Sequence, residues 1–102
     1  MLGYKLFRKR KDGTYGPLFI NRSQVIRTGI TYPAEDHPTR GYSHRPGWHI
    51  CRYMHAPHLS TRDRVWCLVE FEHQETLERP ASQGGTWYLG RTIRILEEKQ
   101  VD

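Results

Sequence analysis

The amino-acid sequence predicts a strand-rich α+β domain: a mostly antiparallel sheet with one or two short helical turns and long structured loops. Three observations lead to this prediction. The chain lacks the apolar spacing of a long amphipathic helix, its nine glycines and six prolines are dispersed, and several short segments have the composition of strands. With 102 residues, it has the length of a single domain that spans residues 1–102.

The first element that we expect is a β-hairpin. Residues 4–10 and 15–20 are suited to strands, and Asp12 and Gly13 between them form a dipeptide that favours a tight turn. Pro17 has no backbone N–H to donate, so the second strand should lie at a sheet edge or contain a bulge.

The middle of the chain is expected to be irregular. Residues 21–27 are predicted to form one helical turn with Ser23 as its cap. Residues 30–47 contain three prolines and two glycines and predict a long structured loop, and residues 54–63 predict a second one.

The C-terminal half holds the clearest strands. A short strand is expected at residues 47–53, and residues 65–72 are predicted to form a central strand, since apolar side chains alternate on one face. These side chains are Val65, Cys67, Val69 and Phe71. Residues 73–79 are expected to form a helical turn, and the tail from residue 97 is expected to fray.

A last long strand is predicted over residues 87–96. Its apolar face should hold Trp87, Leu89, Ile93 and Ile95. Arg91 has the same spacing and is costly on an apolar face. It should therefore pair with Glu70 or Glu72, or be turned outward by a bulge.

The charge is unevenly distributed along the chain. The net charge is +5; residues 1–66 hold 12 Lys/Arg and 4 Asp/Glu, for +8, and residues 67–102 hold 4 and 7, for −3. Five cations crowd the first hairpin and are predicted to bind a partner. These residues are Lys5, Arg8, Lys9, Arg10 and Lys11. The alternative is a solvated edge that discourages strand aggregation.

Histidine and cysteine residues cluster between residues 37 and 58. Neutral imidazole and thiolate are the usual zinc ligands, and His49 and Cys51 leave a strand on one face because they are two residues apart. The predicted ligands are His49, His58, Cys51 and His37, with His55 as a substitute. A closed set would make the zinc structural, whereas three ligands plus water would make it catalytic, and unliganded surface histidines are the alternative.

Several function classes are excluded or disfavoured. There is no phosphate loop, no dinucleotide fingerprint and no serine nucleophile motif. No apolar run approaches the ~20 residues that cross a bilayer, and no N-terminal secretion signal is present, so we expect no membrane contact and a cytoplasmic location.

Much of the chain, from about residue 4 to residue 96, resembles small phage- and prophage-encoded proteins of gut Firmicutes. The resemblance rests on the segments 6–8, 11–13, 16–22, 37–39, 45–49, 56–60, 64–66 and 79–80. It implies a mobile-element origin in a bacterial host. Small accessory proteins of this kind often include anti-CRISPR inhibitors, which bind effector nucleases stoichiometrically.

A second likeness is architectural. The order of strands around Gly47, Trp48 and His49 is similar to minimal folds related to ADP-ribosyltransferases. This likeness implies Arg8, His49 and Glu70 as the residues to test.

Together these observations predict a non-enzymatic, zinc-stabilised binding protein whose partner is a protein, with a type II CRISPR effector nuclease as the first candidate. A small enzyme, either an ADP-ribosyltransferase or a metal-assisted hydrolase, is the second reading. A direct nucleic-acid-binding module is the third.

Overall fold

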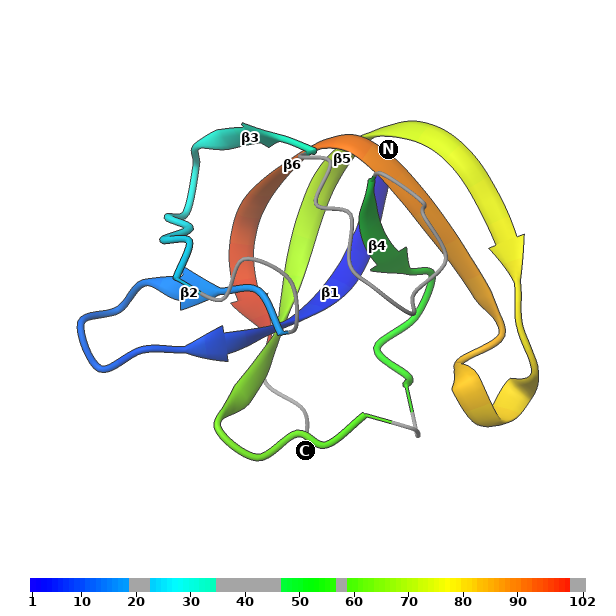
Figure 1. Cartoon of the computed structure of the whole chain (residues 1–102), viewed down its shortest axis with the longest axis horizontal. Helices are drawn as coiled ribbons and strands as arrows, with labels where there is room; N and C mark the ends of the chain where they lie inside the picture. The colour runs from blue at the N-terminus through cyan, green and yellow to red at the C-terminus, as the bar shows by residue number, and fades with distance from the viewer. Residues whose placement is uncertain (19–22, 35–46, 57–58, 100–102) are drawn as a thin grey trace.

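The computed structural model describes residues 1–18, 23–34, 47–56 and 59–99. It confirms an antiparallel, strand-rich fold (Figure 1). The strands in chain order are β1 Leu2–Lys9, β2 Tyr15–Gly16, β3 Thr31–Pro33, β4 Trp48–Cys51, β5 Arg64–Glu78 and β6 Thr86–Lys99. The α component of the predicted α+β class is not confirmed, because the only helical element among the described residues is a 3-10 turn, Ala81–Gln83. In this part of the chain there is also no helix long and apolar enough to cross a membrane.

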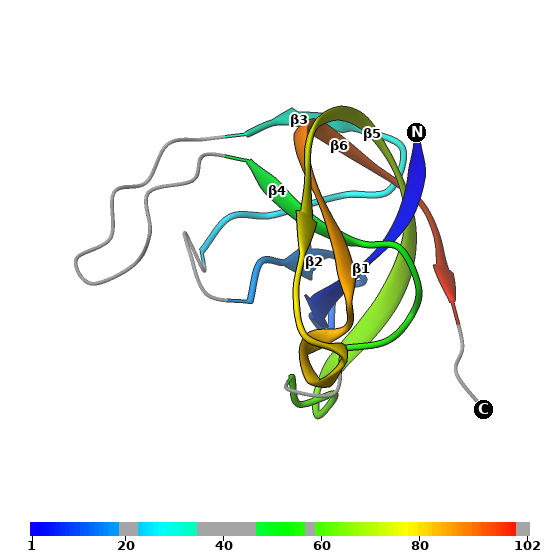
Figure 2. The same ribbon diagram turned by 90° about the vertical axis from the view of Figure 1, so that its right-hand side faces the viewer.

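The strands close into a small barrel. β5 pairs with β1 on one side and with β6 on the other, and β4 pairs with both β6 and β1. The ring β1–β5–β6–β4 therefore returns to its first strand, and the long β5 and β6 bend strongly to allow this closure (Figures 1 and 2). β2 and β3 extend the sheet beside β1 and β6.

The barrel interior holds the main hydrophobic core. The expected alternation on β5 is confirmed: Cys67, Val69 and Phe71 point into this core, and Val65 packs against it. Phe7 from β1 is fully buried in the same cluster. The barrel thus fills its interior with side chains, as small barrels do.

A second, smaller apolar cluster lies on the outer side of the barrel. Its buried members are Leu6, Cys51, Ala56, Trp66 and Trp87. Ala56 belongs to the segment between β4 and β5, which covers this outer face, and the predicted loop at residues 54–63 is confirmed over its described part.

The last strand differs from the prediction. Phe71 faces Ile93 while His73 faces Gly90, so β6 has one extra residue there, a β-bulge. The extra residue reverses which side the following residues face. Trp87 therefore packs on the outer cluster and Ile93 in the interior, contrary to the expected single face.

The same bulge contains Arg91, which is exposed, as the bulge alternative predicted. The predicted pairing partner Glu70 instead receives a 2.9 Å hydrogen bond from Arg94. The sequence spacing led to the wrong arginine because a bulge cannot be seen in a period-two pattern.

Other elements are partly as expected. The turn at Asp12 and Gly13 is confirmed, and Gly13 has a φ of 86° that suits glycine. The helical turn expected at residues 73–79 is wrong, because this segment continues β5 and pairs with β6 as far as Glu78 with Thr86. The tail does not fray at residue 97, since β6 runs to Lys99.

The middle segments also differ. Residues 23–27 form no helical turn; Ile26 instead makes a β-bridge to Tyr15. Part of the loop expected at 30–47 is the strand β3, and its residues 35–46 lie outside the described residues.

Candidate functional site

An open depression lies beside the arm of the β1–β2 hairpin that leads into its turn, next to the start of β5. It is lined by Lys9, Arg10, Lys11, Asp63, Arg64 and Val65. Antiparallel pairing brings these segments together, because Arg8 lies opposite Arg64 and the Lys9 N–H donates to the Asp63 carbonyl at 3.2 Å. Four of the six lining residues are cationic, so the depression is suited to an acidic partner.

Two of the cations expected in a partner-binding patch are bound into the fold. Arg10 donates from Nη1 to the Tyr15 carbonyl at 2.6 Å and from Nη2 to the Gln24 carbonyl at 2.9 Å. Arg8 donates from Nε to the Pro17 carbonyl at 3.3 Å. These bonds attach the segment after the hairpin turn to β1, so both arginines have a structural role and hold their charge in a fixed position.

Lys5 lies apart from the depression. It follows the period of Phe7 on β1, and its Nζ donates to the His49 carbonyl at 2.7 Å and lies within 6 Å of the Phe7 and Trp48 rings. Burial lowers the pKa of Lys5 to about 8. Lys5 therefore ties β1 to β4 beside the core and does not join the other predicted partner-binding residues.

The remaining two predicted cations do line the depression. Lys9 forms an ion pair with Glu98 at 2.8 Å, and this contact raises the pKa of Lys9 above its usual value. Lys11 is exposed at the turn. Lys11 is thus the member of the predicted set that is best placed to meet a partner.

Sequence reasoning missed three lining residues, Asp63, Arg64 and Val65. The Arg-Asp-Arg run at residues 62–64 is visible in the sequence, but its position beside the hairpin depends on the β1–β5 register. Asp63 has a φ of 58°, the one positive φ of a non-glycine residue in the described part of the chain.

The predicted zinc ligands are only partly described. His49 and Cys51 share the outer face of β4 as expected: the His49 ring meets Trp87 edge-on, and Cys51 packs in the cluster that contains Trp87. His55 is exposed in the following segment. His37 and His58 lie outside the described residues.

Within the described part of the chain, no three His, Cys, Asp or Glu side chains are grouped as metal ligands. Cys51 is buried among apolar side chains, and this burial raises its pKa to about 12. The zinc site stays a prediction, because it needs residues beyond those described.

The three residues of the transferase likeness do not converge. Glu70 pairs with Leu2 at one end of the β1–β5 ladder, and Arg8 pairs with Arg64 at the other. Six residues of strand separate the two positions, which corresponds to roughly 20 Å. Glu70 also carries the ion pair with Arg94, so this set does not form one active site.

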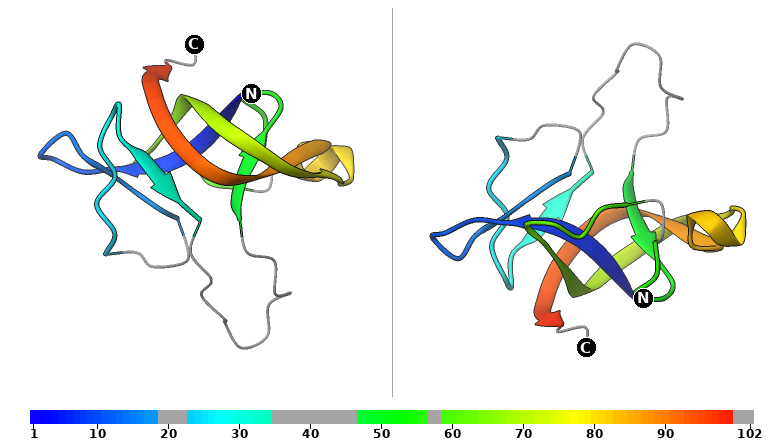
Figure 3. Two further views of the ribbon diagram at one scale, coloured as in Figure 1. Left: turned by 90° about the horizontal axis from the view of Figure 1, so that it is seen from above. Right: turned by 90° about the horizontal axis from the view of Figure 1, so that it is seen from below.

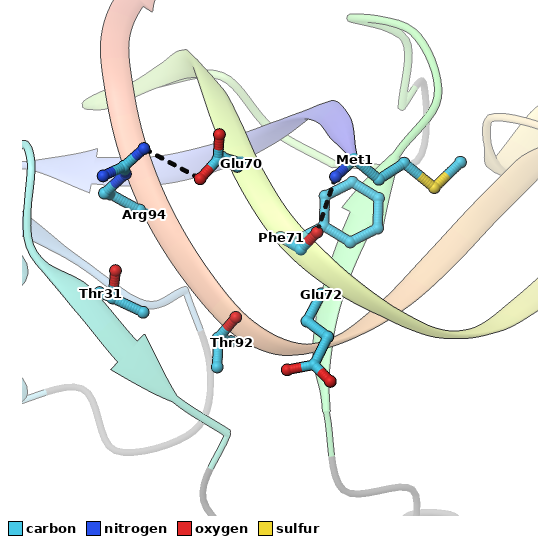
Figure 4. Close-up of a pocket in the computed structure, with 7 residues that line it drawn as sticks. All are labelled: Met1, Thr31, Glu70, Phe71, Glu72, Thr92 and Arg94. Atoms are coloured by element: carbon cyan, nitrogen blue, oxygen red, sulfur yellow. Dashed lines mark hydrogen bonds and ion pairs between the residues drawn. The ribbon is translucent and has the colours of Figure 1, made fainter.

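A second hollow lies where β3, β5 and β6 meet (Figure 4). It is lined by Met1, Thr31, Glu70, Phe71, Glu72, Thr92 and Arg94. Arg94 points to Glu70 across the strands, and its buried Nε has no hydrogen-bond partner among the described residues. The ion pair links β5 to β6, and we assign this hollow a structural role.

Comparison with known proteins adds no assignment: the chain matches no protein-family model, no curated protein and no solved structure.

Proposed function

We propose that this chain is a non-catalytic binding protein that docks through its basic depression onto an acidic surface of a protein partner. The observation that carries the proposal is the convergence of Lys9, Arg10, Lys11 and Arg64 on one depression. Complementary charge steers association and fixes the orientation of the partners. Since Arg10 is already held by two carbonyls, part of the ordering cost is met before docking.

The position of the acidic residues favours a local contact. Glu72, Glu75 and Glu78 are exposed on the β5–β6 hairpin, which points away from the β1–β2 hairpin (Figures 1 and 3). These glutamates outnumber the two exposed arginines of the hairpin, Arg79 and Arg91, so a long nucleic acid that wrapped the domain would meet a net negative charge there. A partner with one acidic patch avoids it.

The resemblance to phage-encoded proteins supports a more specific proposal. We place the protein in the cytoplasm of a bacterial host, as an inhibitor that occupies its partner stoichiometrically. A type II CRISPR effector nuclease is the first partner to test. Direct binding to nucleic acid is the alternative that the same basic residues favour.

The test compares two variants with the same change of charge. Lys11→Glu changes the depression, and Arg91→Glu changes an exposed residue of the opposite hairpin. Binding to the guide-loaded effector should weaken at least about tenfold in Lys11→Glu and stay within about twofold in Arg91→Glu. Equal affinities of the two variants and the unchanged protein would count against docking through the depression.

Zinc binding is proposed as a stabilising element of this protein. His49 and Cys51 supply two potential ligands on one face of β4, and the histidine-rich segments that flank β4 in sequence would supply the others. Elemental analysis of protein purified without a histidine tag should give about one zinc per chain, and His49→Ala should lower both the zinc content and the melting temperature. Less than ~0.2 zinc per chain, with an unchanged melting temperature in His49→Ala, would end this proposal.

A further inference from the structure

Asp63 is the single acidic residue among those that line the basic depression. It is exposed, and its carboxylate forms no ion pair or side-chain hydrogen bond with any described residue although cations lie on either side. Its backbone is held by the hydrogen bond from Lys9 N–H to its carbonyl. A negative charge is therefore presented to whatever enters the depression.

The backbone at this position explains part of the choice of residue but not the charge. A φ of 58° belongs to the left-handed region, where Asn, Asp and Gly are the residues best tolerated. Asn meets the same backbone requirement as Asp and carries no charge. The turn before β5 thus accounts for a small polar residue, whereas the carboxylate needs a separate explanation.

We propose that Asp63 is a selectivity residue, which disfavours a uniform polyanion such as a nucleic-acid strand and favours an acidic protein surface that carries a cation opposite Asp63. The inference rests on the proposed docking through the depression. A continuous row of phosphates would place negative charge against the Asp63 carboxylate. A protein surface can place its carboxylates against Lys11 and Arg64 and a lysine or arginine against Asp63.

The effect is expected to be modest and measurable. Two like charges a few ångströms apart near a solvated surface repel by about 1 kcal/mol or less in high dielectric, which corresponds to roughly threefold to fivefold in affinity. The effect should shrink as salt is added, because the groups are exposed.

The experiment uses two variants that raise the net charge by the same amount. Asp63→Asn removes the carboxylate in the depression, and Glu72→Gln removes one on the opposite hairpin. The probe is a single-stranded DNA oligonucleotide at low ionic strength. Asp63→Asn should bind it about threefold to fivefold more tightly than the unchanged protein, while Glu72→Gln should differ by less than about 1.5-fold.

A second variant locates the gain. If the DNA enters the depression, adding Lys11→Glu to Asp63→Asn should abolish the gain in affinity for the oligonucleotide that Asp63→Asn produces. Equal gains in Asp63→Asn and Glu72→Gln would show that only overall charge matters and would overturn the inference. So would a gain in Asp63→Asn that survives Lys11→Glu.

A peptide arm tests the partner chemistry. The ratio of the affinity for a mixed Glu-Lys-Glu repeat peptide to the affinity for poly-glutamate should be higher in the unchanged protein than in Asp63→Asn. Equal ratios in the two proteins would overturn the inference. The proposed function fails in another way, by the effector binding Lys11→Glu and Arg91→Glu equally well. The two failures are thus distinguishable.

Discussion

The basic end of the barrel and the acidic β5–β6 hairpin use charge in different ways. At the basic end, Arg10 and Lys9 have partners inside the fold, in the Tyr15 carbonyl and the Glu98 carboxylate, while Lys11 is exposed. On the hairpin, the glutamates of β5 are exposed along a strand that pairs with β6 alone beyond residue 70 among the described strands.

This difference shows that net charge along a sequence does not measure the charge available to a partner. The basic segment contributes five cations, yet Lys5, Arg8 and Arg10 serve the fold through backbone carbonyls. The binding capacity of the basic end depends most on Lys11, because Arg64, which comes from another part of the chain, also donates to a backbone carbonyl, that of Ser60 at 2.9 Å. Substitutions should therefore separate structural from partner-facing cations.

The largest effect on stability is expected for Arg10. Arg10→Met removes two charge-assisted hydrogen bonds to carbonyls, each worth about 1.5–3 kcal/mol, and should lower the free energy of unfolding by about 3 kcal/mol, the low end of their sum, because both bonds are only partly buried. Arg91→Met, on an exposed arginine of the other hairpin, should change it by less than about 0.5 kcal/mol. Urea unfolding of the two variants checks this, and equal losses would show that Arg10 is not part of the fold's framework.

The next effect is a pH dependence that comes from Lys5. Its pKa of about 8 lies below the 10.5 of the unfolded chain, so the unfolded state binds more protons between these values, and Lys5 makes stability rise with pH above about pH 8. The thiols of Cys51 and Cys67 act in the opposite direction above about pH 9, because burial raises the pKa of each to about 12. Stability should therefore peak near pH 9.

Urea unfolding at several pH values tests this balance. Between about pH 8 and pH 9 Lys5 alone should add roughly 1 kcal/mol to the free energy of unfolding, and the two thiols should offset roughly 0.7 kcal/mol of it, so the net rise in the unchanged protein is roughly 0.3 kcal/mol. Lys5→Met should abolish this rise and keep the loss at higher pH. A rise that persists in Lys5→Met would mean that another group is responsible.

The smallest effect is expected at the Lys9–Glu98 pair. Glu98→Gln breaks a surface ion pair and should cost less than about 1 kcal/mol. It also leaves the Lys9 charge uncompensated beside the depression, so binding to an acidic partner should strengthen slightly. Thermal unfolding and partner titration measure both changes, and a weaker binding in Glu98→Gln would contradict the assigned role of the depression.

Local patterns predicted the elements whose structure is set by neighbouring residues. The Asp12-Gly13 turn and the alternation of Cys67, Val69 and Phe71 are of this kind, because turn preference and strand period act within a few residues. The inward position of Lys5 could also have been predicted from the sequence, since Lys5 is two residues from the buried Phe7 on the same strand.

Features that depend on distant pairing were not predictable. The bulge that separates the face of Trp87 from that of Ile93 reflects the bend of β6 on closing the barrel. Residues 73–79 were expected to form a helical turn. They instead continue β5, because pairing with β6 overrides local preference. The depression joins residues 9–11 to 63–65, and no local pattern shows that register.

Docking through the basic depression is tested most directly by an NMR titration of the isotope-labelled protein with an acidic peptide, followed residue by residue. Docking through the depression predicts that the backbone amide shifts are concentrated at residues 9–11 and 63–65, and that Lys11→Glu removes them. Shifts spread evenly over the barrel, or centred on the β5–β6 hairpin, would contradict the claim.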